Sequence, residues 1–305
     1  MGTFFVFSGQ GAQAVGMGRD LYENNAAAKK IFDSADRTLG YKLSEICFNG
    51  PAESLTETRH CQVAIYTMSC AALEAFRSLY PEVKPIGCAG LSLGEYGALY
   101  AAGAFSFEDG LKLLAKRGEL MEQACNLTKG GMASVLGGDL AVIKEVCAAC
   151  DIDVANYNNP GQVVISGEAE KVTAAVAELK NRGMRKVIPL TVAGAFHSRL
   201  MKTAGDALIA ELDNCPMQSP AVPVYQNFTA QASDDIAVIK QNLASQVAGS
   251  VRWEECVRAL NALGGDRMIE FGPGNVLTGL MKRTIAEVGL YNVNSMETLS
   301  NFTQD

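Results

Sequence analysis

The sequence predicts an α/β fold in which a small domain is inserted into a larger one built on a parallel sheet. Three observations support this prediction. Over the first hundred residues, apolar strands alternate with helical patterns, which is typical of a parallel sheet with helices on both faces. Residues 126–194 change to the order β-α-β-β-α-β, which is the ferredoxin-like pattern. After residue 195 the alternation of strands and helices resumes.

The larger domain is expected to comprise residues 1–125 and 195–305. It begins with an apolar strand and a glycine-rich loop, and its later elements follow from the period of the apolar residues. The expected elements are a strand at Thr3–Phe7, a loop at 8–18, helices at 21–39 and 64–80, a strand at 85–89, helices at 95–102 and from Ser106, strands at 222–226 and Arg267–Phe271, and a helix at 276–288.

The inserted domain is expected over residues 126–194. Two glycines precede its first strand, and the turn-forming sequence Asn158-Asn-Pro-Gly161 joins its two central strands. Its expected elements are strands at 132–136, 153–157, 162–166 and Lys186–Leu190, with helices at 140–150 and 172–182.

Composition describes a globular chain and excludes some classes of partner. The 305 residues are 48% apolar, which is enough to bury a large core. The formal charge of −7 argues against a general nucleic-acid or membrane-surface binder, because both of those surfaces are anionic. No apolar stretch is long enough to span a bilayer, and the N-terminus lacks the basic start and cleavage site of a signal peptide. We therefore expect a cytoplasmic protein without nucleic-acid or membrane partners.

The nine cysteines are an odd number and lie mostly in apolar segments, as expected of buried thiols in a reducing cytosol. Cys147 and Cys150 match the pattern Cys-x-x-Cys. They lie in an amphipathic run with no second pair and no histidine nearby to complete a zinc or redox site. We therefore expect this pair to pack in the core, and we expect no metal site.

A serine flanked by glycines is the strongest functional signal. The segment Gly90-Leu-Ser-Leu-Gly94 lies between a predicted buried strand and a predicted helix. This is the arrangement of a nucleophile elbow, in which a tight turn lifts the serine hydroxyl clear of the sheet. At a helix N-terminus, backbone N–H groups favour the negative charge that develops in acyl transfer. Ser92 is therefore a candidate nucleophile in an α/β-hydrolase-like domain, although a pattern with three fixed positions also arises by chance.

A serine nucleophile needs a base, and the chain has two histidines, His60 and His197. His197 follows Ser92 in the chain, which is the order found in α/β-hydrolase-like enzymes, and we take it as the base. The alternative is that His197 begins a helix and makes only a backbone contact.

A catalytic triad would add an acid between the serine and the histidine. The candidates all fall in the inserted domain, and none lies at a strand end typical of a triad acid; they are Asp151, Asp153, Glu168 and Glu170. A dyad whose imidazole is oriented by a backbone carbonyl fits the sequence better.

The loop Ser8-Gly-Gln-Gly-Ala-Gln13 follows the first strand. Parallel α/β sheets bind ligands at the carboxyl ends of their strands. The glycines on either side of Gln10 let its backbone approach a substrate closely, so we expect Gln10 in a binding site. The alternative is a flexible loop with no role in binding.

Taken together, these segments and several others resemble the malonyl-CoA:acyl-carrier-protein transacylases of bacterial fatty acid synthesis. The match runs in the family's order over nearly the whole chain, so it is more specific than any one motif. The segments that carry it are Phe7-Ser-Gly-Gln-Gly-Ala-Gln13, Gly90-Leu-Ser-Leu-Gly-Glu-Tyr96, Arg117, Asn156-Tyr-Asn-Asn-Pro-Gly-Gln162, Gly194-Ala-Phe-His197, Gln246, Val251-Arg-Trp253 and Glu270-Phe-Gly-Pro-Gly274.

The resemblance implies a chemical role for each residue of the reacting centre. Ser92 is the nucleophile, His197 is its base, and the main-chain carbonyl of Gln246 holds the imidazole. The backbone N–H groups of Gln10 and Leu93 form the oxyanion hole.

The resemblance also implies how the acyl group is recognised. Arg117 binds the free carboxylate of the malonyl group, because a planar guanidinium meets a carboxylate with two parallel hydrogen bonds. Without the resemblance, Arg117 is interpreted as a cation near the C-terminal end of a helix. Phe196 limits the room at the α-carbon and so favours malonyl over methylmalonyl groups, and Asn156 belongs to the substrate site.

Carrier proteins are acidic, and this chain is acidic too, so docking needs a local basic patch. Lys282 and Arg283 match positions that the family uses in this way. The alternative is that they lie on a solvated helix face.

The sequence departs from the family at two positions. Leu91 stands where many relatives have histidine, and Ser8 stands where many have proline. Neither is a reacting group, but Leu91 alters the polarity close to the serine.

The predicted function is transfer of the malonyl group of malonyl-CoA to the phosphopantetheine thiol of an acyl carrier protein, through a malonyl-serine ester in a ping-pong scheme. We expect a monomer with no bound cofactor. The alternatives are a discrete acyltransferase or acyl hydrolase of polyketide assembly, a non-catalytic carrier-protein-binding module, and a general α/β-hydrolase. The presence of Ser92, His197 and Arg117 together argues against the binding module.

Overall fold

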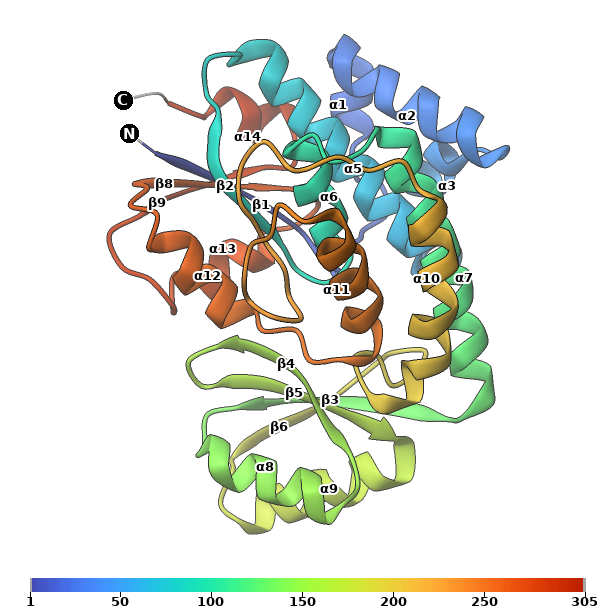
Figure 1. Cartoon of the computed structure of the whole chain (residues 1–305), viewed down its shortest axis with the longest axis vertical. Helices are drawn as coiled ribbons and strands as arrows, with labels where there is room; N and C mark the ends of the chain where they lie inside the picture. Colours follow the sequence, from blue (N-terminus) through green and yellow to red (C-terminus); the bar gives the residue numbers. More distant parts are fainter. Residues whose placement is uncertain (1, 304–305) are drawn as a thin grey trace.

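The computed structural model describes residues 2–303, and within that range the strands form two sheets, one above the other in Figure 1. The large sheet has the order β7-β2-β1-β8-β9, and every neighbouring pair is parallel. Its strands are β1 (Thr3–Phe7), β2 (Pro85–Gly90), β7 (Val224–Tyr225), β8 (Arg267–Phe271) and β9 (Gly289–Val293). The parallel sheet predicted from the sequence is confirmed.

The central strand β1 supplies side chains to the cores on both faces of the large sheet. Phe5 and Phe7 pack in the core that contains α5 (Thr58–Leu79) and α6 (Gly94–Ala101). Phe4 and Val6 pack in the other core, with α12 (Trp253–Asn261) and α13 (Val276–Met281). All four side chains are 0% exposed. This burial on both faces explains why β1 reads as a continuous apolar run rather than an alternating one.

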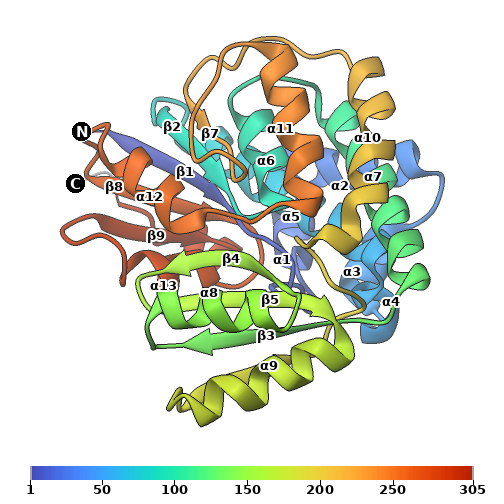
Figure 2. The same cartoon turned by 60° about the horizontal axis from the view of Figure 1, so that its bottom comes forward.

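The small sheet is antiparallel, with the order β4-β5-β3-β6, and α8 (Leu140–Ala149) and α9 (Ala169–Asn181) lie on its face away from the large sheet (Figures 1 and 2). Val135 and Ile165 pack against these helices, whereas their strand neighbours Met132 and Val164 join the core of the large sheet. The predicted ferredoxin-like order is confirmed. The elements are β3 (Gly130–Leu136), α8 (Leu140–Ala149), β4 (Asp153–Asn159), β5 (Gln162–Glu168), α9 (Ala169–Asn181) and β6 (Lys186–Leu190).

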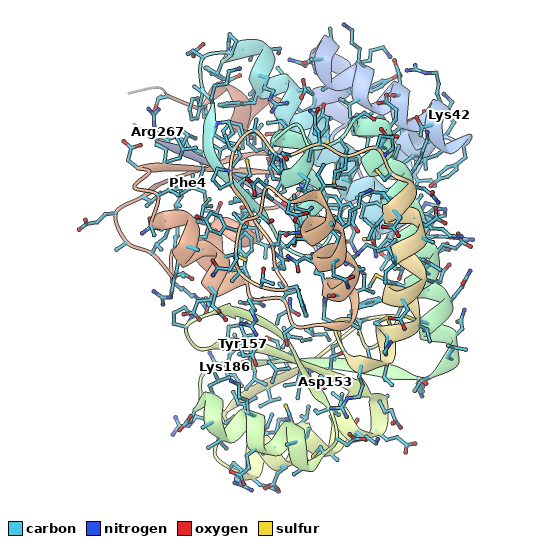
Figure 3. All side chains as sticks on the ribbon, in the orientation of Figure 1. Phe4, Lys42, Asp153, Tyr157, Lys186 and Arg267 are labelled. Atoms are coloured by element: carbon cyan, nitrogen blue, oxygen red, sulfur yellow. The ribbon has the colours of Figure 1, made fainter. Side chains whose placement is uncertain are left out.

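The edge strand β4 connects the two sheets. Tyr157 N–H donates to the carbonyl of Val251, and Val251 N–H donates to the carbonyl of Ala155, at 2.9 and 2.8 Å. Figure 3 labels Asp153 and Tyr157 along this strand. The guanidinium of Arg199, which comes from the large sheet's part of the chain, makes an ion pair with Asp153 at 2.7 Å. These contacts fix the small sheet over the large one.

The remaining helices pack around the large sheet. The long helix α7 lies against both α5 and α10. The remaining helices are α1 (Arg19–Asn24), α2 (Ala26–Leu39), α3 (Leu43–Asn49), α4 (Ala52–Thr56), α7 (Phe107–Leu127), the 3₁₀ turn η1 (Arg199–Met201), α10 (Lys202–Asn214), α11 (Ile236–Ala248) and α14 (Met296–Ser300). None of the helices within residues 2–303 has the length and apolar character needed to cross a membrane.

Several predicted helices differ from the structure at their boundaries, two of them by more than three residues. The helix expected at 21–39 is two helices, α1 and α2. Asn25 separates them because its side chain accepts hydrogen bonds from the N–H groups of Ala27 and Ala28, which caps α2. The helix expected at 64–80 begins earlier, at Thr58.

The predicted end of the large sheet is wrong. The helix expected at 276–288 ends at Met281, and the chain then returns as β9, which pairs with β8 in parallel register. The strand expected at 222–226 is shortened to Val224–Tyr225. Both differences depend on pairing with a distant strand, which the local residue pattern does not contain.

The nucleophile elbow is a turn between β2 and α6 with no room for side chains at its glycines. A Cβ atom at Gly90 would overlap the carbonyl group of Gly94, and a Cβ atom at Gly94 would overlap the carbonyl oxygen of Phe7. Between them Ser92 takes a left-handed backbone conformation, with φ of 55°.

We predict that Gly94→Ala lowers the free energy of unfolding by about 2 kcal/mol or more, because the added methyl group meets backbone atoms that cannot move aside. Gly279→Ala is the matched control. It lies in α13 with open space around the added methyl group, so it should leave stability unchanged or raise it by up to about 1 kcal/mol. Denaturant unfolding measures both, and equal stability of the two variants would contradict the prediction.

Candidate active site

A cavity of about 520 Å³ lies where the small sheet faces the carboxyl ends of the large sheet's strands. This is the position at which open parallel sheets bind ligands. The walls include the elbow, the loop after β1, all four strands of the small sheet and α13. Residues that line it include Gln10, Leu91, Ser92, Asn156, Phe196, His197, Val276 and Leu280.

Ser92 and His197 meet in this cavity. The Ser92 Oγ and His197 Nε2 atoms are 2.8 Å apart, and His197 Nδ1 is 2.8 Å from the main-chain oxygen of Gln246. A carbonyl oxygen can only accept, so Nδ1 carries the proton and Nε2 is left to accept the serine proton. The imidazole therefore has the tautomer and the orientation of a general base.

Burial keeps this imidazole neutral. His197 is 5% exposed, and burial together with the nearby positive charge of Arg117 lowers the pKa of His197 from 6.5 to about 4. The imidazole is thus unprotonated at neutral pH, as a base must be.

Arg117 is buried beside the serine. Its Nη2 donates to Ser92 Oγ and to Gln246 Oε1, both at 3.0 Å, and its Nη1 donates to Gln62 Oε1 at 2.6 Å. Its Nε has no hydrogen-bond partner among residues 2–303. Burial lowers the pKa of Arg117. The interpretation of Arg117 as a cation at a helix end is wrong, because α7 continues to Leu127 and Arg117 points inward from its middle.

The backbone N–H groups of Gln10 and Leu93 donate no hydrogen bond to any atom of residues 2–303. Gln10 lines the cavity beside Ser92, and Leu93 directly follows Ser92 at the start of α6. The N–H groups of the next two residues, Gly94 and Glu95, are already bonded to carbonyls of the elbow. Two N–H groups near the serine are thus left unpaired.

The other predicted residues divide into two groups. Asn156 and Phe196 line the cavity. Lys282 and Arg283 do not line it; they are exposed and directly follow α13, whose Val276 forms part of the cavity wall.

The other candidates for the base and the acid lie elsewhere. His60 is in α5, where its Nδ1 is 3.0 Å from the carbonyl of Ser54. Asp151 and Asp153 make surface ion pairs with Arg199, and neither lines the cavity. None of these groups contacts His197, so a direct triad acid is not found among them.

The two departures from the family pattern have visible contacts. The Ser8 hydroxyl donates to Glu270 Oε1 at 3.3 Å and to the carbonyl of Pro273 at 3.2 Å, which fixes the loop that carries Gln10. Leu91 lies in the cavity wall against Gly9, so it adds apolar surface there.

Three polar residues that the sequence analysis did not assign support the site through hydrogen bonds to its residues. Asn227 Oδ1 accepts from Ser92 N–H at 2.6 Å, and Gln62 holds Arg117. Glu95 is fully buried and contacts the side chain of Gln246. Glu95 directly follows the glycine that ends the elbow motif, so the sequence could have indicated it. Nothing in the sequence around Asn227 or Gln62 indicates a role for either residue.

No group of three or more His, Cys, Asp or Glu side chains suited to a metal ion occurs within residues 2–303. Cys147 packs in the core between the small sheet and its helices, and Cys150 is half-buried beside it. The predicted core position of this cysteine pair is confirmed.

Comparison with known proteins gives consistent relatives. Residues 4–305 match the model of the acyl transferase domain family. Over 300 residues the chain is 44% identical to the malonyl CoA-acyl carrier protein transacylase of Bacillus subtilis (strain 168), covering 97% of this chain and 94% of that protein.

Solved structures agree with the sequence relatives. An acyl carrier protein S-malonyltransferase from Vibrio cholerae matches with a TM-score of 0.94 and 38% identity, covering 98% of this chain and 99% of that one. A malonyl-transacylase solved in complex with its type II polyketide synthase acyl-carrier protein matches with a TM-score of 0.93 and 34% identity, covering 98% of each chain.

We predict that acid destabilises the wild type more than a His197→Gln variant. In the unfolded chain His197 takes up a proton near pH 6.5, but in the folded protein it does so only near pH 4. The unfolded state therefore binds more protons in this window, and stability falls as the pH drops through it. Denaturant unfolding at pH 7 and pH 5 measures the two losses, and an equal loss in both proteins would show that His197 titrates normally.

Proposed function

The chain belongs to the acyl transferase domain family and, within it, to the malonyl-CoA:acyl-carrier-protein transacylases, and on this basis we propose how its site works. It is an acyltransferase that moves a malonyl group from malonyl-CoA to an acyl carrier protein. The observation that carries the mechanism is the position of Ser92 Oγ, within hydrogen-bond distance of both His197 Nε2 and Arg117 Nη2.

In the first half-reaction Ser92 is acylated. His197 Nε2 removes the proton of the Ser92 hydroxyl as Oγ attacks the thioester carbonyl of malonyl-CoA. The negative charge moves to the carbonyl oxygen, where the unpaired N–H groups of Gln10 and Leu93 stabilise it. The carbon–sulfur bond then breaks, coenzyme A leaves with the proton from His197, and a malonyl ester remains on Ser92.

Arg117 binds the malonyl carboxylate. Its Nη2 is 3.0 Å from Ser92 Oγ, so a short acyl group on that oxygen carries its carboxylate into reach of the guanidinium. Its unpartnered Nε supplies a further donor. A buried cation with a donor to spare favours an anionic acyl group over a neutral one. Phe196, in the cavity wall next to His197, limits the space at the α-carbon.

In the second half-reaction the phosphopantetheine thiol of the carrier protein takes the acyl group. His197 removes the thiol proton, the sulfur attacks the ester carbonyl, and the Ser92 oxygen leaves and recovers a proton from His197. Serine, histidine and backbone N–H groups supply every step, so the proposed reaction uses no bound cofactor.

The exposed pair Lys282 and Arg283 is the proposed docking site for the carrier protein. The pair follows α13, and Val276 and Leu280 of that helix line the cavity. An acidic partner held at this pair would therefore stand beside the cavity. The protein's own charge of −7 makes such a local cationic point necessary.

Further parts of the proposal concern the protein as a whole. We propose that residues 1–125 with 195–305, and residues 126–194, act as the large and the small domain. Seven of the nine cysteines are buried free thiols, and the other two are half-buried, which supports a reducing, cytoplasmic location. We propose a monomer that supplies fatty acid synthesis.

A second candidate is service to a polyketide pathway. The likeness to the malonyl-transacylase in complex with its polyketide carrier protein favours it. The chemistry is the same in both cases, and only the carrier protein differs.

We predict that malonyl-CoA adds one malonyl group to the wild type and none to Ser92→Ala, as measured by intact mass. Labelling with acetyl-CoA and methylmalonyl-CoA should be much weaker. Arg117→Ala should reduce the preference for malonyl over acetyl by roughly tenfold or more, because the charged partner is lost. Arg258→Ala, an exposed arginine paired with Glu254, is the control and should keep the preference. Preferential acetyl or methylmalonyl labelling of the wild type would overturn the malonyl assignment.

We predict that reversing both charges at Lys282 and Arg283 to Glu slows transfer to the carrier protein by roughly tenfold at low salt, because the acidic partner loses its attraction. Acylation by malonyl-CoA should remain unchanged. The control reverses two exposed charges on α2, Lys29 and Arg37, and gives the same net charge. Stopped-flow measurement of each half-reaction separates the effects, and equal slowing by both pairs would argue against a local docking site.

A further inference from the structure

A fully buried carboxylate lies directly behind the elbow and takes no part in the chemistry above. Glu95, the second residue of α6, is 0% exposed. Its Oε2 accepts from Asn227 N–H and Gln246 Nε2, both at 2.8 Å, and its Oε1 accepts from Gln226 Nε2 at 3.1 Å. Burial raises the pKa of Glu95 to about 7, and the three hydrogen bonds and the charge of Arg117 oppose that rise. Burying a carboxylate costs free energy of folding, so its presence here indicates a role for the hydrogen bonds that it accepts.

One branch from Glu95 passes through Gln246. The Gln246 Nε2 group donates to Glu95 and also to the main-chain oxygen of Ser92, at 3.1 Å. Because Nε2 is fixed in this direction, Gln246 Oε1 faces Arg117 and accepts from it. The same residue's main-chain oxygen holds His197. Gln246 thus contacts each member of the reacting centre, and Glu95 sets its orientation.

The other branch passes through Asn227. Glu95 accepts a hydrogen bond from the backbone N–H of Asn227, and the side chain of Asn227 in turn contacts the elbow. Its Oδ1 accepts from Ser92 N–H at 2.6 Å, and its Nδ2 donates to the carbonyl of Gly90 at 2.8 Å. These two bonds hold the turn in which Ser92 has its left-handed conformation.

We propose that Glu95 is a positioning residue for acyl transfer, which holds Gln246 and Asn227 and through them fixes the nucleophile, its base and the carboxylate-binding arginine relative to one another. The proposal rests on the proposed acylation of Ser92. A carboxylate suits this place because every group that faces it is an N–H donor. A glutamine at the same position would turn its own NH₂ group towards one of those donors.

The test measures pre-steady-state acylation by malonyl-CoA in the wild type, Glu95→Gln, Gln246→Met and the double variant. Gln246→Met keeps the main-chain carbonyl that holds His197 but removes the amide that connects it to Glu95. We expect each single change to slow acylation by roughly tenfold or more, because small displacements of reacting groups are costly. Since both changes break the connection between Glu95 and Gln246, the slowing in the double variant should be clearly smaller than the product of the two single effects.

Asp36→Asn is the matched control. Asp36 is also a buried carboxylate, and it accepts hydrogen bonds from the N–H and the hydroxyl of Ser44. It lies beside Lys42, which Figure 3 shows at the upper right of the molecule. It should lose stability comparable to that lost by Glu95→Gln and acylate at the wild-type rate. Thermal unfolding of every variant gives the stability change.

The outcomes separate the inference from the function on which it rests. If the wild type takes up no malonyl group, the proposed function itself fails. If the wild type is labelled and Glu95→Gln acylates at the same rate, or if the two single effects multiply in the double variant, the positioning role is wrong. If Glu95→Gln does not fold, Gln246→Met decides alone, and a wild-type rate in that variant rejects the proposal.

Discussion

The site depends on a guanidinium that is buried without a carboxylate against it. Arg117 is 1% exposed, and its hydrogen-bond acceptors are two amide oxygens and the serine hydroxyl. A carboxylate in direct contact would neutralise the cation and occupy the place that we propose for the anionic acyl group. Glu95 is instead one amide further away, beyond Gln246. The charge therefore stays available to the proposed acyl carboxylate, and it also helps to keep His197 unprotonated.

The arrangement of the two sheets makes such a site possible. The elbow and the loop after β1 lie at the carboxyl ends of the large sheet's strands, and β4 of the small sheet, attached to Val251, closes the opposite side. His197 follows β6 of the small sheet, whereas the carbonyl that orients it belongs to α11. No single segment contains the site, so the packing of the sheets determines its geometry.

The sequence predicts the parts of this structure whose causes are local. Thr3–Phe7 and Lys186–Leu190 are strands with the expected bounds, and the elbow follows from glycines whose neighbours exclude side chains. The strand β9 was not predicted because it forms against β8, and nothing in its own residues requires that partner. The same limit applies to Asn227 and Gln62, since one polar residue acquires a role only when folding buries it beside another.

Ser92 and His197 share a backbone feature that bears on how the chain can change over evolution. Each has φ of 55°, a region in which a residue with a side chain costs roughly 1–2 kcal/mol relative to glycine. Glycine would remove this backbone cost, but at His197 it would also leave a cavity and an unpaired buried carbonyl at Gln246, so only at Ser92 can glycine be neutral or stabilising. A gene copy released from selection for activity would therefore lose Ser92 more readily than His197, because packing and hydrogen bonding keep the imidazole in place.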